Sequence, residues 1–471
     1  MVNQAVGQPR RHERPVMTFL GAVGTVTGSR FLLDGPACRV LVDAGLYQGL
    51  KSLRRRNWDP FPVDPHTLDH VLLTHAHLDH TGYLPRLARD GFSGRVSCTR
   101  ETADLSAIVL RDSAHLQEED ARYANDAGFS RHDPALPLYD NKDVERALGL
   151  MTCADFDRAV ELAPGVAATF RPAGHILGSA TIGVQMGEHR VLFSGDLGRA
   201  HHPLLRPPAD PPPSDTIVVE STYGDRRHPP ADPQLLADAI CRTVERRGSV
   251  LIPAFAVDRT ELVLLELRRL REQGSIPDIP VFVDSPMALA ALDVYRSAAA
   301  RGGSQFRREA RDLMAGLGVR GVQAARDVAA SERLNRPRTP SIIISASGMA
   351  TGGRVVHHLA HQLPDRRNTV VITGFQADGT RGRQLLEGAR QVKIHGRYVP
   401  VRAEIVDVPD FSVHSDADET IQWLSRAPRP PSTVYVVHGE PASADALASR
   451  ISAELGWLAV VPSYGERVLL D

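Results

Sequence analysis

The sequence predicts a mixed α/β protein: two sheets flanked by helices, with a second α/β domain that carries a parallel sheet inserted into them. Three observations predict this class. Short β-branched segments separated by glycines open the chain, strand–loop–helix units follow from Gly248, and short strands return after Val401. The length of 471 residues exceeds what one hydrophobic core usually holds, so we expect two domains.

The first half of the chain supplies the two flanked sheets. Residues 17–45 alternate β-branched residues with glycine turns, which is typical of antiparallel hairpins. Residues 70–74 (HVLLT) form a buried-type strand, and residues 82–89 suit a helix, so the histidine-rich segment between them is expected in the connecting loop. Residues 102–150 are mostly helical in pattern. A second sheet region then follows at 166–186 and 189–198.

The second half begins with a different rhythm. Strands followed by a small-residue loop and a helix recur at 249–267, 280–295, 341–363 and 369–388, which predicts a parallel, helix-covered sheet. The proline-rich residues 206–215 suit a linker or a surface loop, and the apolar run directly after them favours the loop. The final strands should rejoin the first domain. We therefore expect a disordered tail at 1–16, one domain at 17–223 and 411–471, and an inserted domain at 224–410.

Composition excludes several classes of protein. Hydrophobic residues make up 42% and charged residues 24% of the chain, and no apolar run is long enough to span a membrane. The polar N-terminus lacks a secretory signal, so a cytoplasmic location is expected. Four scattered cysteines form no C-x-x-C pair, so any metal must be held by histidines and carboxylates. A net charge of -1 gives no overall attraction to nucleic acid.

The segment His75-Ala76-His77-Leu78-Asp79-His80 places three imidazoles and one carboxylate within six residues after a strand. Zinc takes this kind of ligand, whereas the alternative interpretation is a polar surface loop. Four ligands cannot fill two zinc shells, so further ligands are needed. The candidates each follow an apolar run and each could instead be an Asx turn or a satisfied core histidine; they are Asp43, His175, Asp196 and His438.

The pattern H-x-H-x-D-H with a downstream His and Asp resembles the metallo-β-lactamase superfamily, whose fold is an αββα sandwich that binds one or two metals. The segments FLGAVGTVTGSRFLL, HAHLDHTGYLP, AGHILGSA, SGDLG, ESTYGDR, IPAFAVDRTEL and VDSPMA, with the late HSD and HGE, resemble more narrowly the β-CASP nucleases. These include bacterial homologues of the cleavage and polyadenylation specificity factor endonuclease. The resemblance runs from about Phe19 to His438.

This resemblance implies two zinc ions and a role for each matching residue. It implies that one zinc is held by His75, His77 and His175, the other by Asp79, His80 and His438, with Asp196 bridging both and Asp43 orienting a ligand. It also implies catalytic roles for Glu220 and His414, alongside Asp79 and Asp196. In this family the last motif is usually His in enzymes that act on RNA and Val in those that act on DNA, so His438 favours RNA.

The chemistry of such a site suits hydrolysis of a phosphodiester. Two metals about 3.5–4 Å apart can stabilise both the attacking and the leaving oxygen at phosphorus. The leaving ribose oxygen needs a proton, which histidine supplies best near pH 7. His414 fits this role, with Glu220 orienting its ring and holding its charge.

Contacts to the substrate are expected from glycine-rich strand-to-helix turns and from basic residues. The turns at 345–353 and 374–379 place backbone N–H groups at helix starts, which suits phosphate binding or simply packing; the candidate contacts are Ser347, Gly348, Arg381 and Arg383. For His357, His358 and His361 a solvated helix face competes with a phosphate contact. The run Arg54–Arg56 is either part of a nucleic-acid path or an ordinary basic loop.

We therefore expect a zinc-dependent ribonuclease that acts on single-stranded RNA by a two-metal mechanism. The alternatives are a DNA nuclease of the same fold and a hydrolase of small molecules, which would have no use for Glu220 and His414. A binding scaffold would be expected to lack metal ligands, and all of them are present. Endonuclease and 5′-exonuclease action stay open at this stage. No appended RNA-binding module is visible in the sequence, and a homodimer is possible.

Overall fold

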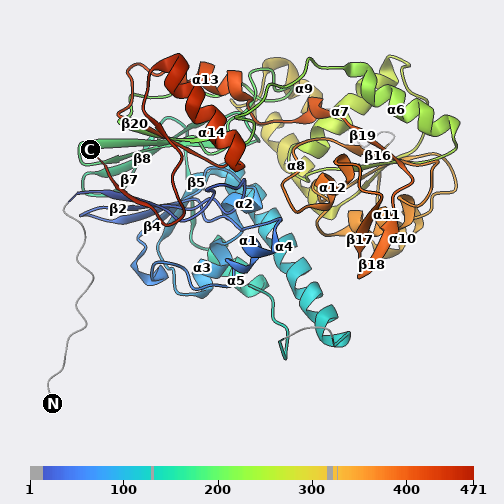
Figure 1. Cartoon of the computed structure of the whole chain (residues 1–471), viewed down its shortest axis with the longest axis horizontal. Coiled ribbons are helices and arrows are strands. Elements are labelled where there is room, and N and C mark those ends of the chain that lie inside the picture. The colour runs from blue at the N-terminus through green and yellow to red at the C-terminus, as the bar shows by residue number, and fades with distance from the viewer. Residues whose placement is uncertain (1–13, 129–131, 316–321, 326, 471) are drawn as a thin grey trace.

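The computed structural model describes residues 14–128, 132–315, 322–325 and 327–470. Figure 1 shows two lobes side by side: a sandwich that carries both labelled ends of the chain, and a second lobe formed by the middle of the chain. Three larger sheets and one hairpin account for the strands. Among the described residues no helix is both long and apolar enough to cross a membrane.

The first sheet has seven strands. In sheet order they are β22 (Arg467–Leu469), β1 (Val16–Phe19), β2 (Phe31–Asp34), β3 (Arg39–Val42), β4 (His70–Leu72), β5 (Arg95–Thr99) and β6 (Met151–Ala154). β1, β2 and β3 pair antiparallel, as the glycine-broken opening predicted, and β3 to β6 pair parallel. β1 starts at Val16, the last residue of the expected tail, whereas residues 1–13 lie outside the described part.

The second sheet also has seven strands. Their order is β21 (Ala459–Val460), β20 (Thr433–Val437), β11 (Thr216–Glu220), β10 (His189–Phe193), β9 (Ala180–Met186), β8 (Val166–Pro172) and β7 (Ala159–Ala163). β20 pairs with β11 in parallel, so the end of the chain does rejoin the first half. Because β10 and β11 are also paired, the proline-rich segment between them is a loop within one sheet and not a domain linker.

Alternating side chains make the two sheets into a layered sandwich. In β2, Phe31 and Leu33 enter the core between the sheets, whereas Leu32 packs under the helices on the outer face. In β11, Val218 points to the core between the sheets and Ile217 to the opposite helices. The outer layers are α3 (Leu84–Arg89), α4 (Arg100–Asp126) and α5 (Asn141–Leu148) on one side, and α13 (Ala417–Ser425) and α14 (Pro441–Arg450) on the other.

The second lobe is built on a six-stranded sheet whose pairings are all parallel, as the repeated strand–loop–helix units predicted. The strand order is β14 (Val322–Ala324), β13 (Val281–Asp284), β15 (Ile342–Ser345), β12 (Val250–Pro253), β16 (Thr369–Ile372) and β19 (Glu404–Asp407). A separate hairpin joins β17 (Gln391–Ile394) and β18 (Arg397–Pro400). The lobe's helices are α6 (Pro233–Glu245), α7 (Arg259–Glu272), α8 (Pro286–Ala300), α9 (Arg308–Ala315), α10 (Val328–Leu334), α11 (Arg354–Gln362) and α12 (Arg381–Leu386).

The two lobes share one apolar core. Val109 of α4 and Leu205 from the sandwich belong to the same buried cluster as Leu292 of α8 and Ile252 of β12. Long α4 runs along the boundary between the lobes in Figure 1. A continuous core of this kind holds the lobes in a fixed relation. The exact domain boundaries at 223/224 and 410/411 stay predictions.

Candidate metal centre and channel

The candidate site lies where several strands of the sandwich end. β3 and β4 of the first sheet run parallel and are followed by Asp43 and His75, and β10 and β20 of the second sheet are followed by Asp196 and His438. Parallel strands bring their carboxyl ends to one edge of a sheet, and polar groups gather there. The predicted residues are therefore brought together from segments far apart in the sequence.

The histidine-rich segment is not entirely a loop, which corrects the expectation from the sequence. His77 is the N-cap of a short helix, α2 (Leu78–Thr81), so Asp79 and His80 lie within its first turn. Backbone hydrogen bonds fix this helix: Ala44 N–H donates to His80 O and Leu46 N–H to Leu78 O, both at 2.8 Å. A four-residue helix has too little length to leave a periodic signal in the sequence.

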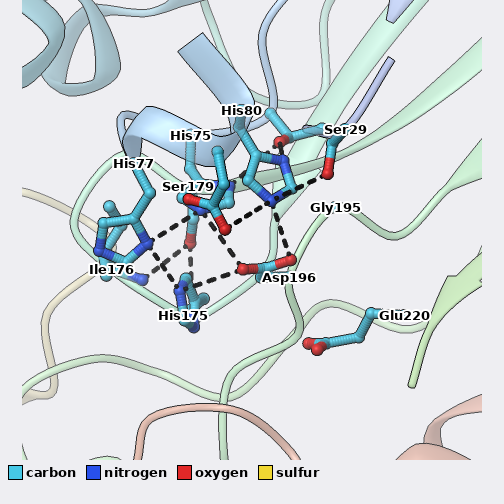
Figure 2. Close-up of polar contacts among 12 residues, drawn as sticks. Ser29, His75, His77, His80, His175, Ile176, Ser179, Gly195, Asp196 and Glu220 are labelled. Carbon is cyan, nitrogen blue, oxygen red and sulfur yellow. Dashed lines mark hydrogen bonds and ion pairs between the residues drawn. The ribbon is translucent and has the colours of Figure 1, made fainter. Parts of the chain in front are cut away.

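One group of candidate ligands is His75, His77, His175 and Asp196. Nδ1 of His77 lies 3.1 Å from Nε2 of His75 and 3.3 Å from Nε2 of His175. Oδ2 of Asp196 lies 3.5 and 3.6 Å from those two Nε2 atoms. Figure 2 shows these rings converging on Asp196. Three imidazoles and a carboxylate are a donor set that zinc takes.

A second group comprises Asp79, His80 and His438. Nε2 of His80 is 3.2 Å from Nε2 of His438, and Oδ2 of Asp79 is 3.4 Å from that same His438 atom. Oδ1 of Asp196 lies 3.2 Å from His80 Nε2 and 3.4 Å from His438 Nδ1. The two oxygens of Asp196 thus face the two ligand groups separately.

Two buried atoms of this cluster accept or donate no hydrogen bond: Oδ1 of Asp196 and Nε2 of His77. A buried polar atom without a partner is costly, and a bound cation is the usual explanation where donors of this kind converge. The residues present therefore fit a metal centre.

The charges of the cluster are strongly coupled. Burial lowers the pKa of His75 and His175 well below the usual value and that of His77 to about 4, which favours the neutral form of these rings. Burial also disfavours the charged form of His80, yet Asp196 and Asp43 outweigh it and raise the pKa of His80 well above the usual value. Burial opposes ionisation of Asp196 as well, but the surrounding imidazoles hold its pKa well below the usual range.

Asp43 stands behind the ligands. It is buried, and its Oδ2 accepts a hydrogen bond from Nδ1 of His80 at 2.7 Å, which leaves Nε2 facing the second group. Thr74 anchors this carboxylate by donating from its backbone N–H to Asp43 Oδ1 at 2.8 Å and from its hydroxyl to Oδ2 at 2.8 Å. Sequence reasoning named Asp43 and overlooked Thr74.

Glu220 and His414 form a pair beside the metal centre. Nδ1 of His414 donates to Oε2 of Glu220 at 3.0 Å and is 3.8 Å from Oδ2 of Asp196. Burial opposes protonation of His414, but Glu220 outweighs it and raises the pKa of the ring. Thr222 donates to the same Glu220 oxygen at 2.5 Å and lies 3.2 Å from Nδ1 of His438, so it connects the pair to the ligands.

A cavity of about 2260 Å³ opens from the metal centre into the second lobe. Its lining includes ligands such as His77 and Asp79, the pair residue His414, and residues of the second lobe such as Phe255 and Ser347. α4 contributes one wall, with Asp112 and Tyr123 among others. The cavity lies between the two lobes, because residues of both line it, and it is called the channel below.

The expected substrate contacts divide into two sets. Ser347 and Arg381 line the channel, and Arg381 is held by the backbone carbonyls of Lys393 and Ala350. Gly348 is buried and packs against the Phe255 ring, where an added Cβ would lie 2.6 Å from a ring carbon. Arg383 donates to Glu387 at 2.6 Å and lies 3.7 Å from Glu440.

The histidines of α11 divide in the same way. His357 and His361 are exposed and line the channel, as expected of one helix face. His358, for which a solvated face was also expected, is buried instead and bonds Asp284 at 2.6 Å. Arg54, in α1 (Lys51–Arg55), is exposed and lies near enough to Arg381 to lower the pKa of that guanidinium further, after burial.

Sequence reasoning passed over three residues beside the centre. The Phe255 ring lies 5.9 Å from the ring of His77, and that of Tyr223 lies 6.3 Å from the ring of His414. Arg259 lines the same channel although it is only 5% exposed. The signal that could have pointed to it is an arginine at the start of a helix, in the loop-to-helix segment that follows the buried strand β12.

The fold and the site together define a metal-dependent hydrolase, and comparison with known families agrees. The Metallo-beta-lactamase superfamily matches residues 23–237, the Beta-Casp domain residues 260–385, and the Zn-dependent metallo-hydrolase RNA specificity domain residues 398–462. The chain belongs to the metallo-β-lactamase superfamily and to its Beta-Casp branch. The resemblance drawn from the sequence is confirmed.

Individual relatives cover most of the chain. A ribonuclease of Thermus thermophilus is 36% identical over 451 residues, which are 95% of this chain and 98% of that protein. Transcription termination factor FttA of Methanocaldococcus jannaschii is 30% identical over 90% of this chain and 67% of its own length. An RNase J-like protein of the same organism is 30% identical over 85% of this chain and 87% of its own length. A solved structure of a protein of unknown function from Enterococcus faecalis covers 97% of this chain and 100% of its own, with a TM-score of 0.53 at 12% identity, which supports the fold alone.

Proposed function

We propose that this protein is a zinc-dependent ribonuclease that hydrolyses phosphodiester bonds of single-stranded RNA with two metal ions. The observation that carries the proposal is the position of Asp196, whose two oxygens each face a different group of imidazoles. A carboxylate between two ligand groups suits a bridge between two ions. The ribonuclease from Thermus thermophilus, similar along almost its whole length, supports RNA as the substrate.

In this proposal His75, His77, His175 and Asp196 would hold one zinc, and Asp79, His80, His438 and Asp196 the other. Bound zinc supplies Lewis-acid stabilisation of the negative charge that develops on the phosphodiester oxygens. The neutral state of His77, whose pKa falls to about 4, keeps its ring nitrogens available to a metal at neutral pH. Asp43 fixes the ring of His80 through Nδ1 and so aims Nε2 at the second ion.

The pair of Glu220 and His414 serves the leaving group. Nδ1 of His414 is bound to Glu220, so Nε2 is the ring atom that can give a proton to the ribose oxygen when the bond breaks. The carboxylate of Glu220 stabilises the imidazolium and fixes the orientation of the ring. Leu197 N–H donates to the other oxygen of Glu220 at 2.5 Å and holds that carboxylate in place.

The extent of the channel favours a polymer strand over a small molecule as the substrate. It extends from the metal centre along α4 on one side and past Ser347 and Arg381 on the other. A lactone or thioester would use only the part next to the metals. A flexible single strand could lie along the whole length.

The test is a zinc-loaded assay on 5′-phosphorylated, 5′-hydroxyl and circular RNA, with DNA of matched sequence. Cleavage of RNA is expected, and cleavage of the circle would show endonuclease action. Asp196→Asn should abolish cleavage. Cleavage of DNA but not RNA would favour the DNA nuclease, a lactone or thioester turned over faster than RNA would favour the small-molecule hydrolase, and full activity of Asp196→Asn would contradict the two-metal mechanism.

A further inference from the structure

Arg259 is a buried cation in the wall of the channel. It is the first residue of α7, follows Asp258, and is only 5% exposed while it lines the channel together with His414. Its guanidinium donates to the backbone carbonyl of Thr373, and its Nε has no hydrogen-bond partner. A donor that is buried and unpartnered at the wall of a channel points to a ligand that enters there.

No carboxylate of the described residues lies within ion-pair distance of Arg259. Its neighbour Asp258 is engaged elsewhere: Tyr295 donates to its Oδ1 at 2.9 Å, and His202 bonds its Oδ2 at 3.0 Å. Glu261, two residues on, is buried, and burial followed by Asp258 raises its pKa well above the usual value, which disfavours its charged form. Arg259 therefore makes no direct ion pair with either of these carboxylates.

Two other arginines are arranged differently. Arg354 is only partly buried, donates to Asp284 at 2.6 Å and is a paired cation. Arg30 has no carboxylate, but it donates to Gly45 O at 2.8 Å and stacks over the ring of Tyr83 at 3.8 Å. A buried charge with neither kind of support costs folding free energy, which an incoming anion would recover. Burial lowers the pKa of Arg259 only to about 10, so the group is still a cation at neutral pH.

A short series of contacts connects Arg259 to His414, which lies beside the candidate metal centre. The turn at Gly374 lies directly on the guanidinium, because an added Cβ there would be 2.7 Å from the NH1 atom of Arg259. The next residue, Phe375, contacts Tyr223 at a centroid distance of 5.5 Å, and Tyr223 contacts His414. Phe375 and Tyr223 thus lie in series between the turn that packs on Arg259 and His414, the proposed proton donor.

We propose that Arg259 is a substrate-binding residue that grips a backbone phosphate of the RNA next to the one that is cleaved. This inference rests on the proposed ribonuclease function. A guanidinium offers two parallel N–H donors that match the oxygens of a phosphate, and its burial makes the contact little screened by salt water. The glycine at 374 is the residue type that lets the backbone pack on the guanidinium without blocking it.

The experiment measures binding of a fluorescent single-stranded RNA to the full-length protein carrying Asp196→Asn, so that the RNA stays intact. Adding Arg259→Met should weaken binding at least tenfold and reduce the slope of log K against log salt by about 0.7, the value for one phosphate contact to a single strand. Arg259→Lys should recover part of the affinity. The melting temperature should stay equal or rise, because an unpaired buried charge has been removed.

Arg39→Met is the matched control. Arg39 donates to Asp34 at 2.9 Å in the sandwich and is not among the residues that line the channel, so its replacement should lower the melting temperature and leave RNA affinity and salt slope unchanged. Arg259→Met with unchanged affinity and slope would overturn the inference. The inference would also be overturned if the melting temperature of Arg259→Met falls as that of Arg39→Met does while Arg259→Lys binds RNA normally. Failure of the parent protein to bind any RNA would contradict the proposed function instead.

Discussion

Asp43 holds the ring of His80 from behind, with 2.7 Å between Oδ2 and Nδ1. The carboxylate is itself fixed by two donors of Thr74. This arrangement sets which nitrogen of His80 faces the second ligand group. The proposed metal centre would therefore depend on Asp43 and Thr74, which lie outside both groups of candidate ligands.

The first prediction concerns Asp43→Asn. The amide carries no charge and accepts only through one atom, so the His80 ring is held less firmly and its basicity falls. Zinc affinity should drop about 10- to 100-fold, measured by titration against a chelator of known affinity. Asp34→Asn, the same change at another buried aspartate of the sandwich, should leave zinc affinity unchanged. Equal affinities for Asp43→Asn and the wild type would contradict this role.

The second prediction concerns Gly45, which lies against the backbone of Asp79. An added Cβ would come within 1.7 Å of Asp79 O and 2.6 Å of Ser29 N, both of them backbone atoms that cannot swing away. Gly45→Ala should therefore cost about 1–3 kcal/mol of stability and displace Asp79. Chemical denaturation and zinc content per chain measure the two effects.

Gly183→Ala provides the control for that substitution. A Cβ at Gly183 would meet only Thr169 O, at 4.0 Å, so stability and zinc content should both be close to those of the wild type. A Gly45→Ala protein with full zinc content and unchanged stability would show that α2 can shift without consequence for the site.

The third prediction is a pH dependence of the zinc-free protein. Burial lowers the pKa of His77 from 6.5 to about 4. Above pH 6.5 the ring is neutral in both the folded and the unfolded chain. As pH falls from 6.5 toward 4, the unfolded chain takes up a proton that the folded chain does not, so stability decreases by up to about 3 kcal/mol from this group.

Denaturant titrations of zinc-free protein at pH 7 and pH 4.5 measure this loss. His77→Asn should reduce the difference between the two pH values, because the titrating group is gone. His115→Asn, at an exposed histidine of α4, should leave the difference as it is. If the difference in unfolding free energy between pH 7 and pH 4.5 is the same in His77→Asn and in the wild type, the His77 ring does not cause the effect.

Much of the fold could be predicted because it depends on local patterns. The apolar runs of β2 and β11 predict buried strands, and the repeated units of the second lobe predict its parallel sheet. The candidate ligands could also be named, because most of them come shortly after an apolar run, and their role as ligands stays a prediction. Their convergence could not be derived from spacing alone and depended on the family resemblance.

The substrate contacts were harder to predict for physical reasons. A glycine-rich turn such as that at Gly348 looks the same in sequence whether it binds phosphate or makes room for a ring, and here it packs on Phe255. His358 belongs to an amphipathic helix whose buried face happens to include it, opposite Asp284. The unpaired charge of Arg259 depends on Asp258 bonding Tyr295 and His202, which no local sequence pattern records.

The last prediction separates the roles of His414 and Glu220. If His414 supplies the proton and Glu220 holds its ring, His414→Ala should lower kcat on RNA by about 10²–10⁴-fold, and Glu220→Gln should do so by less. The double variant should be no slower than His414→Ala, because Glu220 acts through that ring. Zinc content should stay unchanged in His414→Ala.

His361→Ala, at an exposed histidine that lines the channel, is the matched control and should keep kcat. If the losses in kcat multiply in the double variant, Glu220 has an independent function. If His414→Ala loses zinc, His414 is a metal ligand, a role consistent with the 3.8 Å between its Nδ1 and Oδ2 of Asp196.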